Sequence, residues 1–150
     1  MAHPWRPQLR LVAAVAVGGA AGALLRYAAE TLWPTPAGAW PTAVFLVNLT
    51  GCLVLGLLGG RLATREVGGR ATPDWLRPLA VTGVLGGLTT FSTMMVDAIE
   101  LAEARGMLPA IAYLGASCAL GLVLVSLGWF VSSPGSFRAA GDELTEAEQA

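Results

Sequence analysis

Charge is scarce in this sequence, and the positive charge that it has comes entirely from arginine. Charged residues make up 13% of the 150 residues, none of the nine basic residues is lysine, and the net charge is −1. That charged share is about half the usual one for a globular protein. Together with a mean hydropathy of +0.63, this composition excludes disorder, a nucleic-acid-binding surface and most small soluble enzymes.

Cysteine is rare as well. Cys52 and Cys118 are the only two, and each lies within an apolar segment. No second cluster of metal ligands accompanies them, so we interpret both as reduced core residues rather than as a disulfide or a metal pair.

Uncharged apolar sequence, in contrast, is abundant. A helix needs about 20 mostly apolar residues to cross a bilayer, and continuous apolar runs favour helices over the alternating strands of a barrel. No charged residue occurs in 11–25, 31–60, 78–96 or 106–137. The sequence therefore predicts an all-α integral membrane protein, with residues 1–131 forming one unit of four transmembrane helices. The predicted spans are about 9–32, 42–63, 77–104 and 107–131.

The arginines indicate an orientation. Four spans place both ends of the chain on one side of the membrane, and seven of the nine arginines lie on that side, against Arg26 and Arg105 near the other. The positive-inside rule then predicts cytoplasmic termini for a multi-pass protein of the cell membrane. Residues 132–150 form a predicted polar, acidic cytoplasmic tail. All five tryptophans fall near predicted helix ends, as in an aromatic belt.

Polar clusters interrupt three of the apolar runs, and polar groups inside a membrane are functional candidates. In the first span, Gly18 and Gly22 form a small-xxx-small pattern that lets helix backbones approach closely. Arg26, one turn further on, either extends to the interface or provides a fixed positive charge at the mouth of an anion path. In the second span, Asn48 either forms an interhelical hydrogen bond or donates to a passing anion.

The third cluster, Gly83 to Met94, is the most informative. It crowds three glycines, three threonines and one serine into the middle of a predicted span. Glycine disfavours a helix interior by about 1 kcal/mol, so we expect the third helix to be broken mid-membrane, exposing main-chain groups that can hold ions. The alternative is a tight glycine-mediated helix crossing in which Ser and Thr bond to their own backbone.

Together the three clusters resemble those of the Fluc (CrcB) fluoride channels, over about residues 10–131. The family's segments GGxxGxxxR, Asn-x-x-Gly and GGLTTFST are present here as Gly18 to Arg26, Asn48 to Gly51 and Gly86 to Thr93. The resemblance implies an antiparallel dimer in lipid with two fluoride pores, and a structural, non-transported Na⁺ at the dimer centre.

The resemblance also implies roles for single residues. The main-chain carbonyls of Gly86 and Thr89 match the Na⁺ site, and Arg26 matches an arginine near the aqueous vestibule. The positions that match the permeation path are Asn48, Phe91, Ser92, Thr93, Met94, Tyr113 and Ser117.

Three positions depart from the family pattern. Met94 replaces the second pore phenylalanine, Val44 replaces a threonine one turn before the pore asparagine, and Gly121 occupies the third position of the polar track on the fourth helix. Methionine is soft but has no comparable positive ring edge. Because the arginine distribution favours one orientation, we hypothesise that a separate, oppositely oriented subunit supplies the missing pore groups.

The sequence thus predicts a passive, fluoride-specific channel that exports cytoplasmic fluoride, and not an enzyme. One alternative is a small proton-coupled multidrug exporter, which needs a membrane-embedded carboxylate, whereas Asp97 is expected towards the end of the third span. Another is a non-transporting membrane assembly subunit, which would explain the glycines but not Phe91 and the adjacent threonines.

Overall fold

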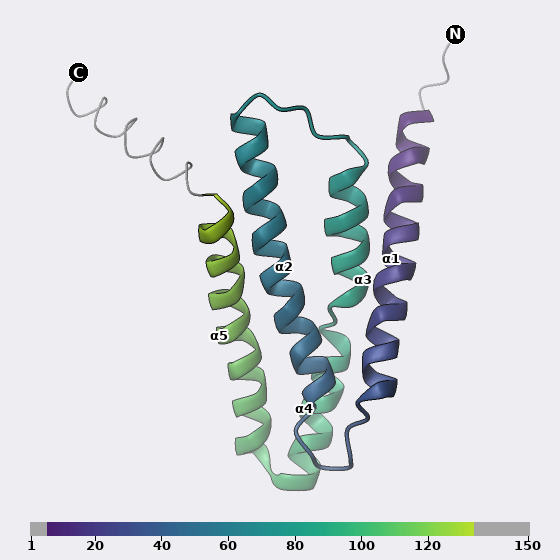
Figure 1. Ribbon diagram of the computed structural model, residues 1–150. Coiled ribbons are helices and arrows are strands. Elements are labelled where there is room, and N and C mark those ends of the chain that lie inside the picture. Colours follow the sequence, from purple (N-terminus) through teal and green to yellow (C-terminus); the bar gives the residue numbers. More distant parts are fainter. Residues whose placement is uncertain (1–5, 134–150) are drawn as a thin grey trace, which may run out of the picture.

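The computed structural model describes residues 6–133, and all the regular secondary structure in that part of the chain is helical (Figure 1). Three elements are continuous helices: α1 (Arg6–Leu32), α2 (Thr42–Val67) and α5 (Met107–Ser132). The third span comprises a π-helical stretch η1 (Pro78–Leu85), one helical turn α3 (Gly86–Leu88) and, after a gap, α4 (Ser92–Arg105). Four segments are long and apolar enough to cross a membrane. The predicted all-α fold, four spans and interrupted third span are therefore confirmed, and most of the predicted tail lies outside the described residues.

The interruption moves the third span from one neighbour to another. Before it, η1 and α3 pack along α1, whereas after it α4 packs on α5. Helix α2 packs along α5 for much of its length, and Figure 1 shows α4 lying beneath η1 at a different inclination. The described residues thus form two groups of helices: α1 packs with η1 and α3, and α5 packs with α2 and α4. The broken third span contributes to both groups and connects them.

Glycines bring the helix backbones of α1 and η1 into direct contact. A Cβ atom on Gly18 would overlap the carbonyl oxygen of Leu79, and one on Gly83 would lie 2.9 Å from the Cα atom of Gly18. On the other helix pair, a Cβ on Gly128 would lie 2.6 Å from the carbonyl oxygen of Leu53. The close helix approach predicted from Gly18 is therefore present, and glycine allows a similar close backbone contact between α2 and α5.

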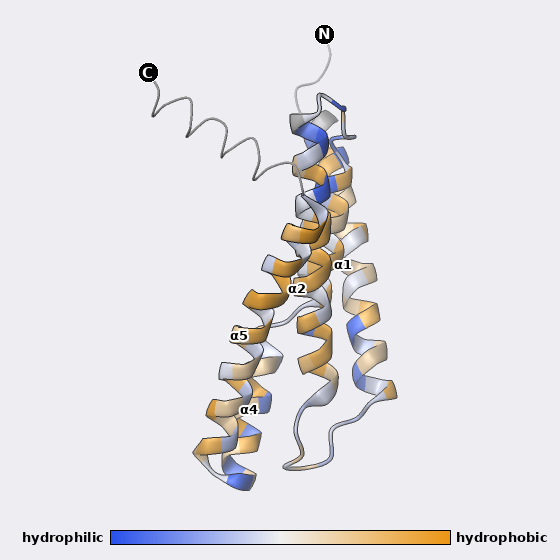
Figure 2. Ribbon diagram, turned by 60° about the vertical axis from the view of Figure 1, so that its left-hand side comes forward, coloured by the Kyte–Doolittle hydropathy of each residue, from blue (hydrophilic) through white to orange (hydrophobic). Residues whose placement is uncertain are grey.

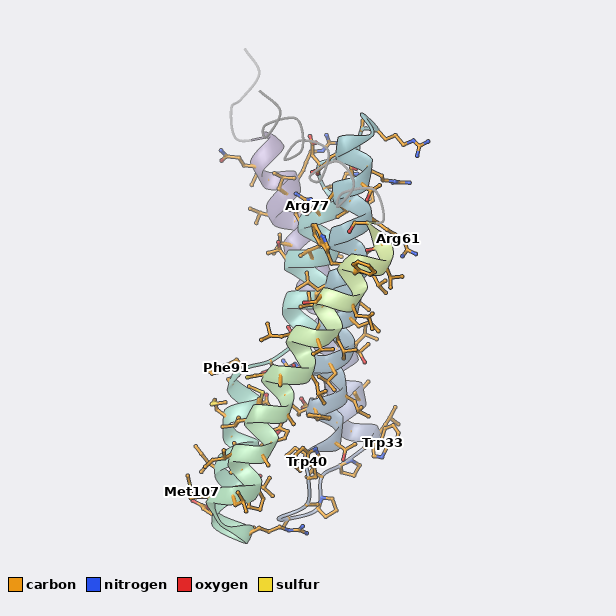
Figure 3. The ribbon with its side chains drawn as sticks, turned by 90° about the vertical axis from the view of Figure 1, so that its left-hand side faces the viewer. Trp33, Trp40, Arg61, Arg77, Phe91 and Met107 are labelled. Atoms are coloured by element: carbon orange, nitrogen blue, oxygen red, sulfur yellow. The ribbon has the colours of Figure 1, made fainter. Side chains whose placement is uncertain are left out.

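The outer surface suits a bilayer. Large apolar side chains such as Leu24 and Phe130 are exposed, and hydrophobic residues cover the middle of the helices while hydrophilic ones gather near their ends (Figure 2). Arg61 and Arg77 lie at one end, and Trp33 and Trp40 lie near the other (Figure 3). The chain is a multi-pass membrane protein.

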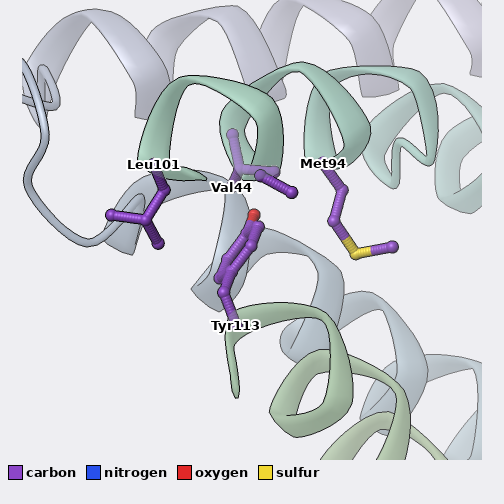
Figure 4. Packing of buried hydrophobic residues seen from close by; sticks show 5 residues of the cluster. Val44, Met94, Leu101 and Tyr113 are labelled. Carbon is purple, nitrogen blue, oxygen red and sulfur yellow. The ribbon is translucent and has the colours of Figure 1, made fainter. Parts of the chain in front are cut away.

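A small hydrophobic core joins α2, α4 and α5 below the interruption. Val44, Met94, Leu101 and Tyr113 pack together there with Ala98 (Figure 4). Trp40 meets the ring of Tyr113 edge to face, with ring centroids 5.4 Å apart. The core fixes the position of α4 relative to the interruption above it.

Candidate functional site

The helical path of the third span stops at two threonines. Thr89 has an extended backbone, with φ −76° and ψ 152°, and the next regular helix begins at Ser92. The amide and the hydroxyl of Thr89 both donate to the carbonyl oxygen of Leu85, at 2.9 Å and 2.8 Å. This ends the first half-helix in the middle of the span, in the region we call the break (residues 89–91).

Asn48 holds the break from the neighbouring helix α2. The Thr90 amide donates to Asn48 Oδ1 at 2.9 Å, and Asn48 Nδ2 donates to the Thr90 carbonyl oxygen at 3.0 Å. The side-chain amide thus pairs with Thr90 as a peptide group of an adjacent strand would. Of the two roles considered for Asn48, the structure shows the interhelical hydrogen bond, while the second Nδ2–H remains for another acceptor.

Gly51 contacts the other threonine of the break. A Cβ atom at position 51 would overlap the Cγ2 methyl group of Thr89, so a side chain there would displace Thr89. Asn48 and Gly51 are one turn apart on α2, so the two ends of the Asn-x-x-Gly segment contact the two adjacent threonines of the break, Asn48 at Thr90 and Gly51 at Thr89. This gives that spacing a structural reason within one subunit.

Two of the main-chain carbonyls at the break lose their usual helical donors to side chains. In an unbroken helix the amides of Thr90 and Thr93 would donate four residues back, to Gly86 and Thr89. Here the Thr90 amide donates to Asn48, and the Thr93 amide donates to Thr90 Oγ1 at 3.1 Å. The carbonyl oxygens of Gly86 and Thr89 are therefore the two that side chains release from helical bonding.

Thr90 also begins the second half-helix. Its hydroxyl oxygen accepts from the Thr93 amide and donates to Thr93 Oγ1 at 3.0 Å, which is an N-cap arrangement. Ser92 Oγ lies 3.3 Å from the same oxygen. Ser92 and Thr93 are thus organised around Thr90.

Arg26 extends towards the end of the first half-helix. Its Nε donates to the Gly87 carbonyl oxygen at 3.4 Å, and Nη1 lies 3.4 Å from Glu30 Oε1, with the arginine side chain 27% exposed. Carbonyls at a helix C-terminus attract positive charge. In the described subunit, Arg26 therefore caps this half-helix, a contact that neither sequence-based interpretation foresaw.

A groove of about 630 Å³ opens at the break, on the face between η1 and α5. Six of the predicted site residues line this groove: Asn48, Gly86, Thr89, Phe91, Met94 and Ser117. Arg26, Ser92, Thr93 and Tyr113 do not line it. No group of three or more His, Cys, Asp or Glu side chains gathers anywhere in residues 6–133, so main-chain and neutral polar groups dominate the break.

The two residues matched to the pore phenylalanines face different surroundings. Phe91 is 69% exposed and points away from the subunit (Figure 3), whereas Met94 is 6% exposed and packs in the core beside Val44 (Figure 4). The two positions therefore differ: the Met94 side chain is buried within the subunit, whereas the Phe91 ring is free to contact an ion or another molecule outside the chain.

Below the groove, polar side chains continue along α5. Ser117 donates to the Tyr113 carbonyl oxygen at 2.7 Å, and the fully buried Tyr113 hydroxyl donates to Asp97 Oδ2 at 3.3 Å. Asp97 is not among the site residues that the sequence predicts. Its position one turn after Met94, on the inner face of α4, is the signal that could have revealed it.

These features define a class: a small four-span membrane protein in which two half-helices end at polar groups within the bilayer, as in many ion-conducting proteins. A family described as "CrcB-like protein, Camphor Resistance (CrcB)" matches residues 13–129. The chain belongs to this family, which is one of ion channels rather than enzymes.

Similar proteins of known name are also described as ion channels. The chain is 48% identical over 124 residues to "Fluoride-specific ion channel FluC 1" of Streptomyces coelicolor, covering 82% of this chain and 77% of that protein. It is 42% identical to "Fluoride-specific ion channel FluC 2" of Nocardia farcinica, covering 85% of each chain. It is 40% identical to "Fluoride-specific ion channel FluC" of Helicobacter acinonychis, covering 78% of this chain and 91% of that one.

Proposed function

We propose that the chain is a subunit of a fluoride-specific channel in the cell membrane, which lets cytoplasmic fluoride leave down its electrochemical gradient. The observation that carries this proposal is the groove at the break, where Asn48, Phe91 and Ser117 lie along one opening in mid-membrane. The family and the names of the relatives support fluoride as the ion.

Fluoride is small and strongly hydrated, so a selective path must replace its water with donors. The second Nδ2–H of Asn48 is one such donor, and the positive ring edge of Phe91 is another. The hydroxyl of Ser117 donates within its own helix, and it must rotate away from the Tyr113 carbonyl before it can donate to an ion. Met94 offers volume but no ring edge.

A second subunit is part of the proposal. Phe91 is 69% exposed, and the groove is open on the side where the break lies. An antiparallel partner packed there would cover the ring and close the path. The excess of arginine on one side of the four spans favours a single orientation, with cytoplasmic termini and a distinct partner of opposite orientation.

The carbonyl oxygens of Gly86 and Thr89 suit a structural Na⁺ at the contact between the subunits. Oxygen ligands suit a hard cation, and these two oxygens are released from helical bonding by Asn48 and Thr90. When bound, the ion would neutralise the dipoles of the carbonyl groups that hold it. Within this chain, the side chains of Asn48 and Thr90 bind the amides that would otherwise occupy these two carbonyl oxygens.

Flux through liposomes tests the proposed function. We expect purified protein, reconstituted with a co-expressed partner subunit, to release fluoride and not chloride. Phe91→Ile is expected to slow release by about fivefold, because an aromatic edge contact contributes on the order of 1 kcal/mol. The variant should fold normally because the ring is exposed. The proposed function would be refuted if fluoride were released neither by this chain alone nor by this chain with its partner, or if chloride were released equally fast. Full flux from this chain alone would refute only the distinct partner.

Replacing Na⁺ tests the cation site. In N-methylglucamine buffer we expect the assembled protein to unfold and dissociate more readily than in Na⁺, and readdition of Na⁺ should restore it. At a hundred times the dissociation constant, the bound ion would contribute about 2.7 kcal/mol to assembly stability. Thermal unfolding and size-exclusion chromatography measure this without flux, and identical behaviour in both buffers would exclude a structural Na⁺.

A further inference from the structure

A second groove, of about 700 Å³, lies where the start of α1 meets the segment that leads into η1. Arg10, Asp74 and Trp75 line its outer part, and the apolar side chains of Leu11, Val17 and Leu79 continue it along the two helices. None of its lining residues belongs to the groove at the break. It is therefore a separate feature of the membrane-facing surface.

The groove carries one positive and one negative side chain that do not pair with each other. The ion pairs among residues 6–133 join Arg26 to Glu30 and Arg77 to Glu66. Arg10 and Asp74 are both exposed and take part in neither pair. Two opposite charges left apart on one groove suit a ligand that itself carries two separated charges.

The position of these charges indicates that the ligand is a lipid. Arg10 lies near the start of α1 and Asp74 just before η1, and both elements begin at the same end of the bundle (Figure 1). Trp75, 49% exposed, belongs to the residue type that prefers the level of lipid head groups. From there, the apolar part of the groove runs towards the middle of the bilayer, where Val17 is 66% exposed.

We propose that this groove binds one phosphatidylethanolamine molecule. Arg10 binds the phosphate, Asp74 accepts hydrogen bonds from the primary ammonium group, and an acyl chain lies along Leu11, Val17 and Leu79. Phosphatidylcholine presents the same phosphate, but its quaternary ammonium has no N–H to donate to Asp74. Phosphatidylglycerol is net negative and has no cation to place against that carboxylate, so Asp74 selects against it.

The test measures which lipid the full-length protein retains. Protein stripped with detergent is incubated with an equimolar mixture of phosphatidylethanolamine, phosphatidylcholine and phosphatidylglycerol, and bound lipid is counted by native mass spectrometry. We expect phosphatidylethanolamine to be enriched about fivefold over each of the others, equivalent to about 1 kcal/mol. Equal retention of the three lipids, or a preference for phosphatidylglycerol, would overturn the proposal.

Variants locate the site. Asp74→Asn is expected to remove the preference for phosphatidylethanolamine over both other lipids, and Arg10→Gln to lower the retention of all three. Arg70→Gln is the matched control, because Arg70 is exposed near the same end but does not line the groove. Each variant should unfold at the temperature of the parent protein. The assignment of the lipid to this groove would be refuted if Asp74→Asn kept the preference for phosphatidylethanolamine. It would also be refuted if Arg70→Gln lowered lipid retention as much as Arg10→Gln does.

Discussion

Asn48→Ala is expected to destabilise the subunit by about 2–6 kcal/mol and to abolish fluoride flux. The substitution removes the partner of both the Thr90 amide and the Thr90 carbonyl, in a part-buried site, and a backbone group left unpaired away from water costs about 1–3 kcal/mol. Water that enters the groove can replace the lost partner only in part, because the rest of the break is enclosed by helices. The break is then expected either to re-form a continuous helix or to lose its order.

Unfolding in mixed micelles of detergent and SDS measures the change in stability, and liposome release measures flux. Thr50→Ala is the matched control, because Thr50 lies on the same helix but is exposed and does not line the groove. It should behave as the parent protein in both assays. If Asn48→Ala unfolded with the parent midpoint, the amide would not hold the break, and any loss of flux would instead come from the missing ion donor.

The spans were predictable because membrane insertion depends on composition over about 20 residues, and uncharged runs of that length are visible in the sequence. Their ends were less predictable. The second span was expected to finish at residue 63, yet α2 continues to Val67 past Arg65. A hydropathy count stops at charge, whereas a helix can continue while its arginines reach the head-group region.

The break was foreseen in kind but not in detail. The density of Gly, Thr and Ser indicates that a helix is weak over Gly83 to Met94, but not which turn opens. That choice depends on the Asn48–Thr90 pairing, which joins residues 42 positions apart, and hence on the register of α2 against the third span. The π-helical winding of Pro78–Leu85 has no sequence signal that we can identify.

The different surroundings of Phe91 and Met94 were also not predictable from the sequence. Family resemblance treats both as pore positions, and only two residues lie between them. Because Phe91 precedes the first turn of α4 and Met94 lies within it, one side chain points outward and the other into the core. Arg26 likewise could be assigned as a membrane charge from sequence, but its contact with Gly87 required the fold of the half-helix.

Gly22→Ala is expected to prevent normal packing of α1 on the third span, with a loss of stability of about 3 kcal/mol or more. A Cβ atom at position 22 would overlap the Val84 carbonyl oxygen and lie 2.7 Å from the Leu88 amide nitrogen. Both contacts are with backbone, which cannot rotate away as a side chain can, so the two helices must separate. Separation would also withdraw Arg26, one turn along α1, from the Gly87 carbonyl.

Gly19→Ala separates this clash from the general effect of adding a methyl group to α1. The Cβ position of residue 19 has no atom within 4 Å beyond its own helix, and alanine favours a helix by about 1 kcal/mol over glycine. We therefore expect Gly19→Ala to match or exceed the parent in folded yield and unfolding midpoint, while Gly22→Ala elutes largely as aggregate on size exclusion. Equal behaviour of the two variants would mean that the α1–η1 contact is not the close backbone approach described above.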